Sequence, residues 1–261
     1  MTDDVLLFEA VGPVARLTLN RPKAMNSLNS AILLGLEAWL EEIAARDDLR
    51  VLVLTGSGPA FCAGADLKEV LAGATAAPGG ADFLDRASIV FGQLRAFPKP
   101  VIAALNGVTM AGGLELAMCA DLVVAAQSAV IGDAHANYGV YPGAGGAAIL
   151  PRLIPLNMAM YLLLTGKTLS ADEMKTLGLV CEVHPDEALA EAVMALAGQI
   201  ALKSPLALRR MKEVARASAD KTREDALLHE QVLLRQHLRS ADLQEGLLAF
   251  AEKRPPQFQG R

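Results

Sequence analysis

Apolar and polar positions alternate through Val14–Asn20, a pattern typical of a β-strand with one buried face. Short, mostly apolar runs follow at Val51–Thr55, Val101–Leu105 and Leu122–Ala125. Runs of this kind, rich in Val, Ile and Leu and bounded by turn residues, indicate strands that are buried on both faces of a sheet. The hydrophobic pattern therefore predicts a sheet whose strands are mainly parallel.

Helical patterns fill the stretches between these strands. Ala31–Ala45 is predicted to be a helix, and Asn29 or Ser30 is placed to act as its N-cap. Ser170–Glu173 has the pattern of a capping box, in which a hydroxyl and a carboxylate satisfy the first free N–H groups of a helix. Gly178 is placed to end the short helix that follows. Strands that alternate with helices predict an α/β core.

The pattern changes towards the C-terminus. From Asp186 onward it is helical throughout, with breaks at Ser204–Pro205 and near Asp220. We therefore expect an α/β core at residues 1–198 and a helical region at 199–261. Apolar stripes in this second region face either the core or a neighbouring subunit, and they include Leu227, Leu228, Val232 and Leu233.

Composition supports a globular protein. The chain has 261 residues, of which 52% are hydrophobic, so it can bury a substantial core and is not a disordered chain. The formal net charge is -5, and the sequence lacks the excess of basic residues that is typical of a nucleic-acid-binding protein. The longest uncharged stretch, Ala134–Pro151, is interrupted by polar residues, Gly and Pro, so we expect no membrane span. A run of small residues at Gly73–Gly80 predicts a flexible surface loop.

Cysteine usage and the first residues of the chain indicate a cytoplasmic protein. Cys62, Cys119 and Cys181 form neither a CxxC motif nor an even set, and we expect them to be buried free thiols. The N-terminal segment MTDDVLLFEA has no basic region and no cleavage site of an export signal. No ligand cluster for a metal is visible, since His184, His229 and His237 have no partners at metal-ligand spacing.

Two segments stand out because small residues follow a predicted buried strand in each. They are Ala60–Lys68 and Asn106–Glu115. Gly112 and Gly113 are expected to begin a helix, where free backbone N–H groups favour an anion. Glu115 then falls in the first turn of that helix. From the residues alone, this is either an anion-binding helix start beside a carboxylate or a tight turn with a solvated glutamate.

These segments resemble the paired signature of the crotonase (enoyl-CoA hydratase/isomerase) superfamily, through Phe61–Leu67, Asn106–Gly107 and Ala111–Ala117. The resemblance covers nearly the whole chain, and its matching segments follow one another in the same order as in the family. Its further parts are Asn20–Leu28, Pro100–Leu105, Ala120–Leu122, Pro142–Gly146, Leu164–Gly166, Gly178–Val180 and Phe250–Arg254.

The resemblance implies an α/β fold that is a spiral of ββα units with a helical C-terminal trimerisation region, commonly in a dimer of trimers. It implies an acyl-CoA thioester as substrate and no separate cofactor. The N–H groups of Ala65 and Gly112 form the implied oxyanion hole. The implied contacts with CoA and substrate are Lys23, Ala24, Ala63, Asp66, Leu67, Lys68 and Gly113, with Phe250 and Lys253 reaching the CoA of a neighbour.

The sequence departs from the family pattern at one catalytic position. Hydratases of the family use two glutamates, of which the first matches Glu115 and the second falls at His135. Simple isomerases keep their single glutamate at the second position, so isomerisation loses support. A histidine can serve as acid or base near neutral pH. Asp133 is close enough in sequence to orient the ring if both residues lie on one strand, and Tyr138 and Tyr141 flank the implied acyl end.

Three functions remain open on these residues. The leading hypothesis is a lyase that adds water to an enoyl-CoA, with Glu115 acting on the water and His135 supplying the α proton. The second is a hydrolase that uses the same pair to cleave a C–C bond of a β-oxo or cyclic acyl-CoA. The third is an acyl-CoA-binding relative without turnover, in which His135 is a passive pocket residue.

Overall fold

The larger of two sheets forms the centre of the molecule. The computed structural model describes residues 5–74 and 82–261. In this part of the chain the larger sheet has the strand order β1-β2-β3-β5-β7-β10. The pairs from β2 to β10 are parallel, and β1 with β2 forms an antiparallel hairpin, so the prediction of a mainly parallel sheet is confirmed. The strands are β1 (Leu6–Val11), β2 (Val14–Leu19), β3 (Val51–Gly56), β5 (Val101–Leu105), β7 (Leu122–Ala126) and β10 (Glu182–His184).

The sequence did not predict the smaller sheet, which has the order β4-β6-β8-β9. Its strands are each three residues long, too short for a hydrophobic period to show: β4 (Ala60–Cys62), β6 (Val108–Met110), β8 (Val130–Gly132) and β9 (Thr168–Ser170). Successive units place one strand in each sheet, as in β3–β4, β5–β6 and β7–β8. This repetition is the spiral of ββα units that the resemblance implied.

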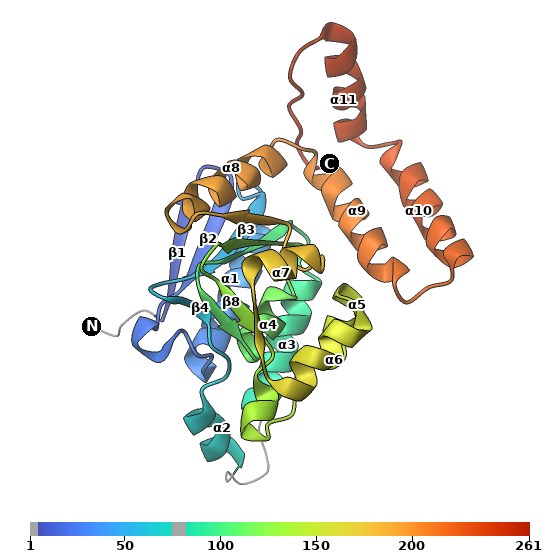
Figure 1. Ribbon diagram of the computed structural model, residues 1–261. Helices are drawn as coiled ribbons and strands as arrows, with labels where there is room; N and C mark the ends of the chain where they lie inside the picture. Colours follow the sequence, from blue (N-terminus) through green and yellow to red (C-terminus); the bar gives the residue numbers. More distant parts are fainter. Residues whose placement is uncertain (1–4, 75–81) are drawn as a thin grey trace.

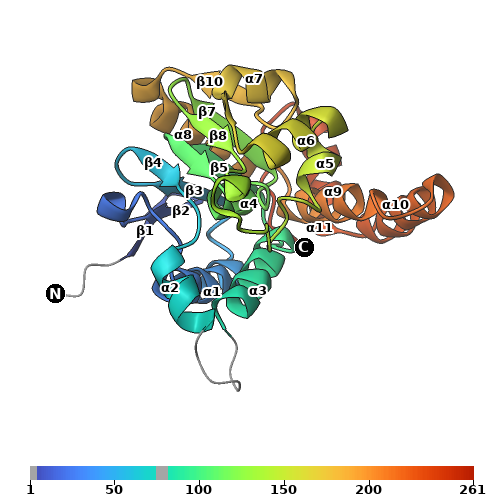
Figure 2. The same cartoon turned by 60° about the horizontal axis from the view of Figure 1, so that its bottom comes forward.

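Helices cover the sheets from both sides. Figure 2 shows α1, α2 and α3 grouped together on one side of the sheets, with α7 and α8 on the opposite side. The helices of the core are α1 (Ser30–Ala45), α2 (Leu67–Ala74), α3 (Phe83–Arg95), α4 (Gly112–Ala117), α5 (Leu150–Leu153), α6 (Leu156–Thr165), α7 (Ala171–Thr176) and α8 (Leu189–Ala201), with the 3-10 turns η1 (Pro22–Ala24), η2 (His135–Tyr138) and η3 (Asp186–Ala188).

The predicted caps are present. Asn29, and not Ser30, is the N-cap of α1, where its side chain accepts the Ile32 N–H at 3.0 Å. Ser170 and Glu173 form the predicted capping box of α7. The predicted surface loop begins inside α2, which extends to Ala74, and its residues 75–80 lie outside the described residues.

A helical arm follows the core. It consists of α9 (Pro205–Ser218), α10 (Arg223–His237) and α11 (Ala241–Glu252), and Figure 1 shows it projecting away from the sheets. The expected boundary at residue 198 falls within α8, which continues to Ala201. Asp121 ties the arm to the core, because its carboxylate accepts hydrogen bonds from Lys212 at 2.6 Å and from Arg216 at 2.8 Å.

The thiols differ in their surroundings. Cys62 and Cys119 are buried, as expected, and burial raises the pKa of the Cys62 thiol to about 12 and that of Cys119 to about 11. The expectation was wrong for Cys181, which is exposed. This residue follows α7 directly before the short edge strand β10, where the chain returns to the surface.

Candidate active site

The backbone amides of Ala65 and Gly112, which follow β4 and β6 in the chain, lie close together. The Leu28 N–H donates to the Gly64 carbonyl at 2.8 Å, and the Asp66 N–H donates to the Leu28 carbonyl at 2.7 Å. Since these two bonds flank Ala65 in a parallel bridge, the N–H of Ala65 itself points away from Leu28. A Cβ atom on Gly112 would lie 3.4 Å from the Ala65 nitrogen, so the two predicted oxyanion-hole residues are neighbours.

A strained residue holds the Gly112 amide in place. Ala111, the N-cap of α4, has φ 49° and ψ −121°, a conformation that costs a residue with a side chain on the order of 1–3 kcal/mol. Its N–H donates to the Gly132 carbonyl at 3.1 Å, which fixes the start of α4 against β8. Gly113 is needed for packing, since a Cβ atom there would lie 2.0 Å from the Cys62 carbonyl oxygen.

Glu115 is held by a glycine-rich loop. The residue is only 4% exposed, which excludes the solvated first-turn glutamate left open by the sequence. Its Oε1 accepts the N–H groups of Ala144 and Gly146, each at 2.8 Å. Two backbone donors on one oxygen fix the orientation of the carboxylate.

His135 is the first residue of η2 and is paired with a buried carboxylate. Its Nδ1 lies 2.9 Å from Oδ1 of Asp133, and its side chain is only 10% exposed. Asp133 follows β8 directly, and Ala134, with φ 58°, makes the turn that brings the two residues together. The two residues thus meet in a turn after β8, beyond the end of the strand.

The carboxylates raise the pKa of His135. Burial acts to lower this pKa, but the hydrogen bond to Asp133 and the negative charges of Asp133 and Glu115 outweigh it, so the pKa lies above the ordinary value of 6.5. Gly146 joins the three groups: its N–H binds Glu115, and a Cβ atom on it would lie 2.5 Å from Oδ2 of Asp133. The structure therefore links Glu115 to the Asp133–His135 pair through Gly146.

An apolar cavity of about 280 Å³ borders His135. It lies between η2, the loop that follows it, and α6. Tyr141 lines the cavity, whereas Tyr138, which is 77% exposed, does not. Beyond Asp133 and His135, the lining found among the described residues is uncharged and consists of Ala136, Val140, Tyr141, Pro142, Ala147, Met160, Leu163 and Leu164.

The predicted CoA contacts near the oxyanion hole form one group. The Ala63 N–H donates to the Met25 carbonyl at 3.0 Å, directly after η1, which carries Lys23 and Ala24. Arg21 binds the carboxylate of Asp66 at 2.9 Å, and this guanidinium holds the pKa of Asp66 below its usual range.

The remaining predicted contacts lie on the surface. Leu67 and Lys68 are exposed at the start of α2. Phe250 and Lys253 lie at the end of α11, on the arm, with the Phe250 side chain 87% exposed.

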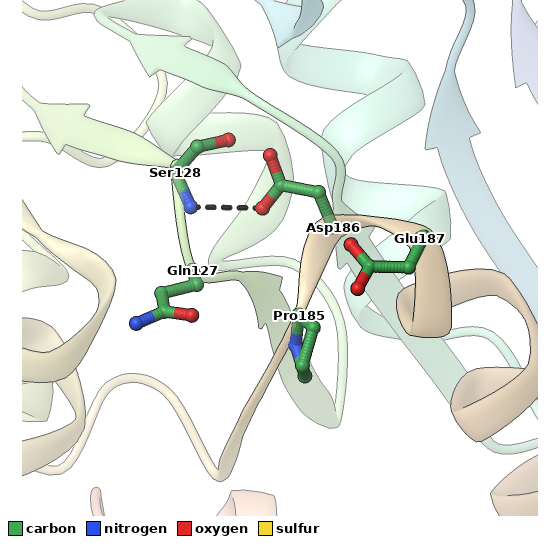
Figure 3. Close-up of a pocket in the computed structure, with 5 residues that line it drawn as sticks. All are labelled: Gln127, Ser128, Pro185, Asp186 and Glu187. Atoms are coloured by element: carbon green, nitrogen blue, oxygen red, sulfur yellow. Dashed lines mark hydrogen bonds between the residues drawn. The ribbon is translucent and has the colours of Figure 1, made fainter.

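A second cavity, of about 390 Å³, lies at the carboxyl ends of β7 and β10. Figure 3 shows that it is built around the hydrogen bond from the Ser128 N–H to Asp186, with none of the predicted catalytic residues in its lining. In residues 5–74 and 82–261 no three His, Cys, Asp or Glu side chains gather as metal ligands. No helix in this part of the chain has the length and apolar character needed to cross a bilayer.

Comparison with known proteins identifies the family. The family model for enoyl-CoA hydratase/isomerase matches residues 9–261. The chain belongs to this family. A 2,3-dehydroadipyl-CoA hydratase of Escherichia coli is 38% identical over 248 residues, which cover 95% of this chain and 96% of the relative.

Solved structures agree with this identification. The enoyl-CoA hydratase of Bacillus anthracis has a TM-score of 0.91 at 35% identity and covers 98% of this chain and 100% of its own. That of Mycobacterium tuberculosis has a TM-score of 0.88 at 35% identity, with 99% and 100% covered. The chain is therefore an enzyme of the hydratase type that acts on an acyl-CoA, and the alternative of C–C cleavage is not favoured.

Sequence reasoning missed several residues that shape the site of this hydratase. The amides of Ala144 and Gly146 were noted only as part of a family motif, although a glycine-rich loop is a common source of free N–H groups. Arg21 was missed because its partner, Asp66, lies 45 positions away in the chain. The strain at Ala111 has no signal in the sequence, since alanine seldom adopts a positive φ.

Proposed function

We propose that the hydratase adds water to a 2-enoyl-CoA with Glu115 and His135 as its acid–base pair. The observation that carries this proposal is that one loop lies against both groups: the Gly146 N–H binds Glu115, and a Cβ atom on Gly146 would lie 2.5 Å from Oδ2 of Asp133, the partner of His135. The neighbouring amides of Ala65 and Gly112 complete the set of groups that the reaction needs.

In the proposed reaction, Glu115 as carboxylate takes a proton from water while the water oxygen bonds to the β carbon. The C=C electron pair moves towards the thioester and gives an enolate. The imidazolium of His135 then donates its proton to the α carbon, which regenerates the thioester carbonyl. The sum is the addition of one water molecule across the double bond. A proton transfer from Glu115 to His135 afterwards restores the starting state.

The amides of Ala65 and Gly112 would stabilise the enolate oxygen. Fixed N–H donors favour the charge that develops in the transition state, and the loss of one such donor typically costs about 3–4 kcal/mol of barrier. Because both donors belong to the backbone, side chains at these positions need only be small. This accounts for alanine and glycine there and for the strain that the chain tolerates at Ala111.

The CoA moiety is assigned to the surface between η1 and the start of α2. Lys23 and Lys68 are exposed there and would attract its phosphates. Ala24, Ala63, Asp66 and Leu67 would contact the rest of the CoA moiety. Because CoA arrives with the substrate, the reaction needs no separate cofactor. The cytoplasm is the proposed setting.

Self-association belongs to the same proposal. Phe250 and Lys253 lie on the arm, and we assign them to the CoA bound by a neighbouring copy in a trimer or a dimer of trimers. In support, large apolar side chains are exposed along the arm: Met211, Leu227, Leu228, Val232, Leu234, Leu238, Leu247, Leu248 and Phe250. Exposed apolar surface of this extent marks an interaction site.

The apolar cavity beside His135 supports an uncharged acyl chain as the substrate class. The E. coli relative named for 2,3-dehydroadipyl-CoA acts on an acyl group that ends in a carboxylate. The described lining of the cavity in this chain contains no Lys or Arg to pair with such a group. Burial of an unpaired charge is costly, whereas each buried methylene gains about 0.8 kcal/mol.

The test is to mix the purified protein with crotonyl-CoA and to follow the loss of the ultraviolet band of the enoyl thioester. The Glu115→Gln and His135→Ala variants are each expected to lower kcat by about 10²–10⁴-fold, the usual worth of a general acid or base. His184→Ala is the matched control, since His184 also pairs with a carboxylate at 2.9 Å but lies on β10. Mass spectrometry should find a product heavier by one water, with its carbon chain intact.

Two results would contradict the proposal. Full activity of His135→Ala would remove His135 from the mechanism. Tight binding of crotonyl-CoA and longer enoyl-CoAs, without any loss of the band, would instead favour the acyl-CoA-binding relative.

A further inference from the structure

Asp133 contacts the ring of His135. Of the two described carboxylates that raise the pKa of this ring, Asp133 is the more deeply buried. It is 1% exposed, whereas Glu115 is 4% exposed. Its Oδ1 accepts two contacts from the same residue, Nδ1 of the His135 ring at 2.9 Å and the His135 backbone N–H at 3.3 Å. The backbone contact fixes the carboxylate relative to the turn, so the ring is held by a group that cannot easily rotate.

We propose that Asp133 is a positioning residue that fixes the tautomer of His135. A carboxylate oxygen can only accept a hydrogen bond, so Nδ1 must carry the hydrogen that it shares with Asp133. Nε2 is then the only ring nitrogen left to exchange a proton with the substrate. This inference rests on the proposed role of His135 as the acid of the hydration reaction.

The second oxygen of Asp133 gives an independent reason for a charged partner. Oδ2 is buried without a hydrogen bond in the described part of the chain, and it faces the backbone of Gly146. A buried carboxylate with an unpaired oxygen is costly unless a positive charge lies beside it. The His135 ring is the group placed to provide that charge, so Asp133 and the imidazolium stabilise each other.

Few other described groups near the His135 ring could stabilise its positive charge. Glu115, on α4, is the other carboxylate whose charge reaches His135. From α6, the cavity is lined by Met160, Leu163 and Leu164, which carry no charge, and the loop contributes the phenol of Tyr141. Asp133 therefore acts on the ring both through its charge and through its hydrogen bond, whereas Glu115 acts through its charge.

The wild-type protein provides a test that needs no activity and no change at Asp133. With ¹⁵N-labelled histidine, the ring-nitrogen resonances of His135 are assigned by their absence from the His135→Ala spectrum. Above its pKa, His135 should show a protonated Nδ1 and an unprotonated Nε2. A protonated Nε2 would overturn the proposal, whatever the rate of hydration.

The variant Asp133→Asn then separates a positioning role from a structural one. Asparagine keeps the size and an acceptor oxygen but loses the charge. We expect the pKa of His135 to fall, kcat to drop by at least about 10- to 100-fold, the effect of losing a carboxylate that orients a metal-bound histidine, and KM to change little. Asp186→Asn is the matched control, because Asp186 is an exposed aspartate that accepts a backbone N–H at 3.0 Å and lines the second cavity, which contains none of the predicted catalytic residues.

The outcomes distinguish this proposal from the proposed function. An unchanged pKa of His135 and an unchanged kcat in folded Asp133→Asn would overturn the role of Asp133. Full activity of His135→Ala would instead overturn the proposed function, while the tautomer in the wild-type spectrum would still report on Asp133. If Asp133→Asn fails to fold, the wild-type spectrum decides alone.

Discussion

Glu115 and Gly146 are 31 positions apart in the chain, and the Gly146 N–H donates to Oε1 of Glu115 at 2.8 Å. The Ala144 N–H donates to the same oxygen. The Glu115 carboxylate is therefore oriented by the backbone of a loop, and the conformation of that loop sets where the carboxylate points. Changes in the loop should act on the reaction even though its residues are small and carry no functional side chain.

Gly146→Ala should lower kcat by about 100-fold, the usual effect of displacing a reacting group by about 1 Å. The added Cβ atom would lie 2.5 Å from Oδ2 of Asp133 and 2.7 Å from Cβ of Pro142, so the loop must move. Gly143→Ala, in the same loop, is the control, since nothing lies within 4 Å of a Cβ atom there. Steady-state kinetics with crotonyl-CoA checks both, and equal rates for the two variants would show that the loop does not position Glu115.

The rate of hydration should fall as the pH rises through the pKa of His135. The proposed reaction needs the imidazolium of His135, and the carboxylates of Asp133 and Glu115 raise the pKa of this ring above its ordinary value of 6.5. The fall in kcat/KM should therefore begin above the pH expected for a free histidine. In Asp133→Asn the same fall should move to lower pH. A profile of kcat/KM against pH measures both, and a flat profile through this range contradicts a histidine acid.

The parts of the fold that sequence patterns predicted are those with a period long enough to be seen. β3 and β5 were expected because their apolar runs are continuous, and α1 because its apolar positions repeat behind an N-cap at Asn29. β4 and β6, which precede the predicted oxyanion-hole residues Ala65 and Gly112, have three residues each and show no period. The candidate site therefore follows strands that are too short to be predicted from their hydrophobic pattern.

The candidate site was predicted only as far as residue types allow. Glu115 and His135 were recognised from their place in a motif, but their burial and the contact between His135 and Asp133 depend on turns. The sequence allowed Asp133 to orient His135 only if both lay on one strand, and the turn that pairs them had no local signal, because Ala134 has a positive φ, which is uncommon for alanine. Tertiary contacts enforce these conformations, and tertiary contacts are what a single sequence does not display.

Longer unbranched enoyl-CoAs should be better substrates than crotonyl-CoA until the cavity beside His135 is full. About 0.8 kcal/mol per buried methylene predicts a rise in kcat/KM of about fourfold per carbon. Met160→Trp should narrow the cavity and lower kcat/KM for octenoyl-CoA at least about tenfold, with little change for crotonyl-CoA. Leu156→Trp, on the same helix but outside the lining, is the control. An equal loss for both substrates would place the acyl chain elsewhere.

Leu228→Glu should weaken self-association of the protein. Leu228 is 60% exposed on α10, and burial of one such side chain in an interface contributes about 1.5–3 kcal/mol, which a buried unpaired carboxylate more than reverses. Gln231→Glu adds the same charge at an exposed polar position of that helix and should leave assembly intact. Light scattering across a range of concentrations measures the mass. Because Phe250 and Lys253 are assigned to a neighbour's CoA, dissociation should also raise KM, whereas a wild-type monomer at every concentration would exclude that assignment.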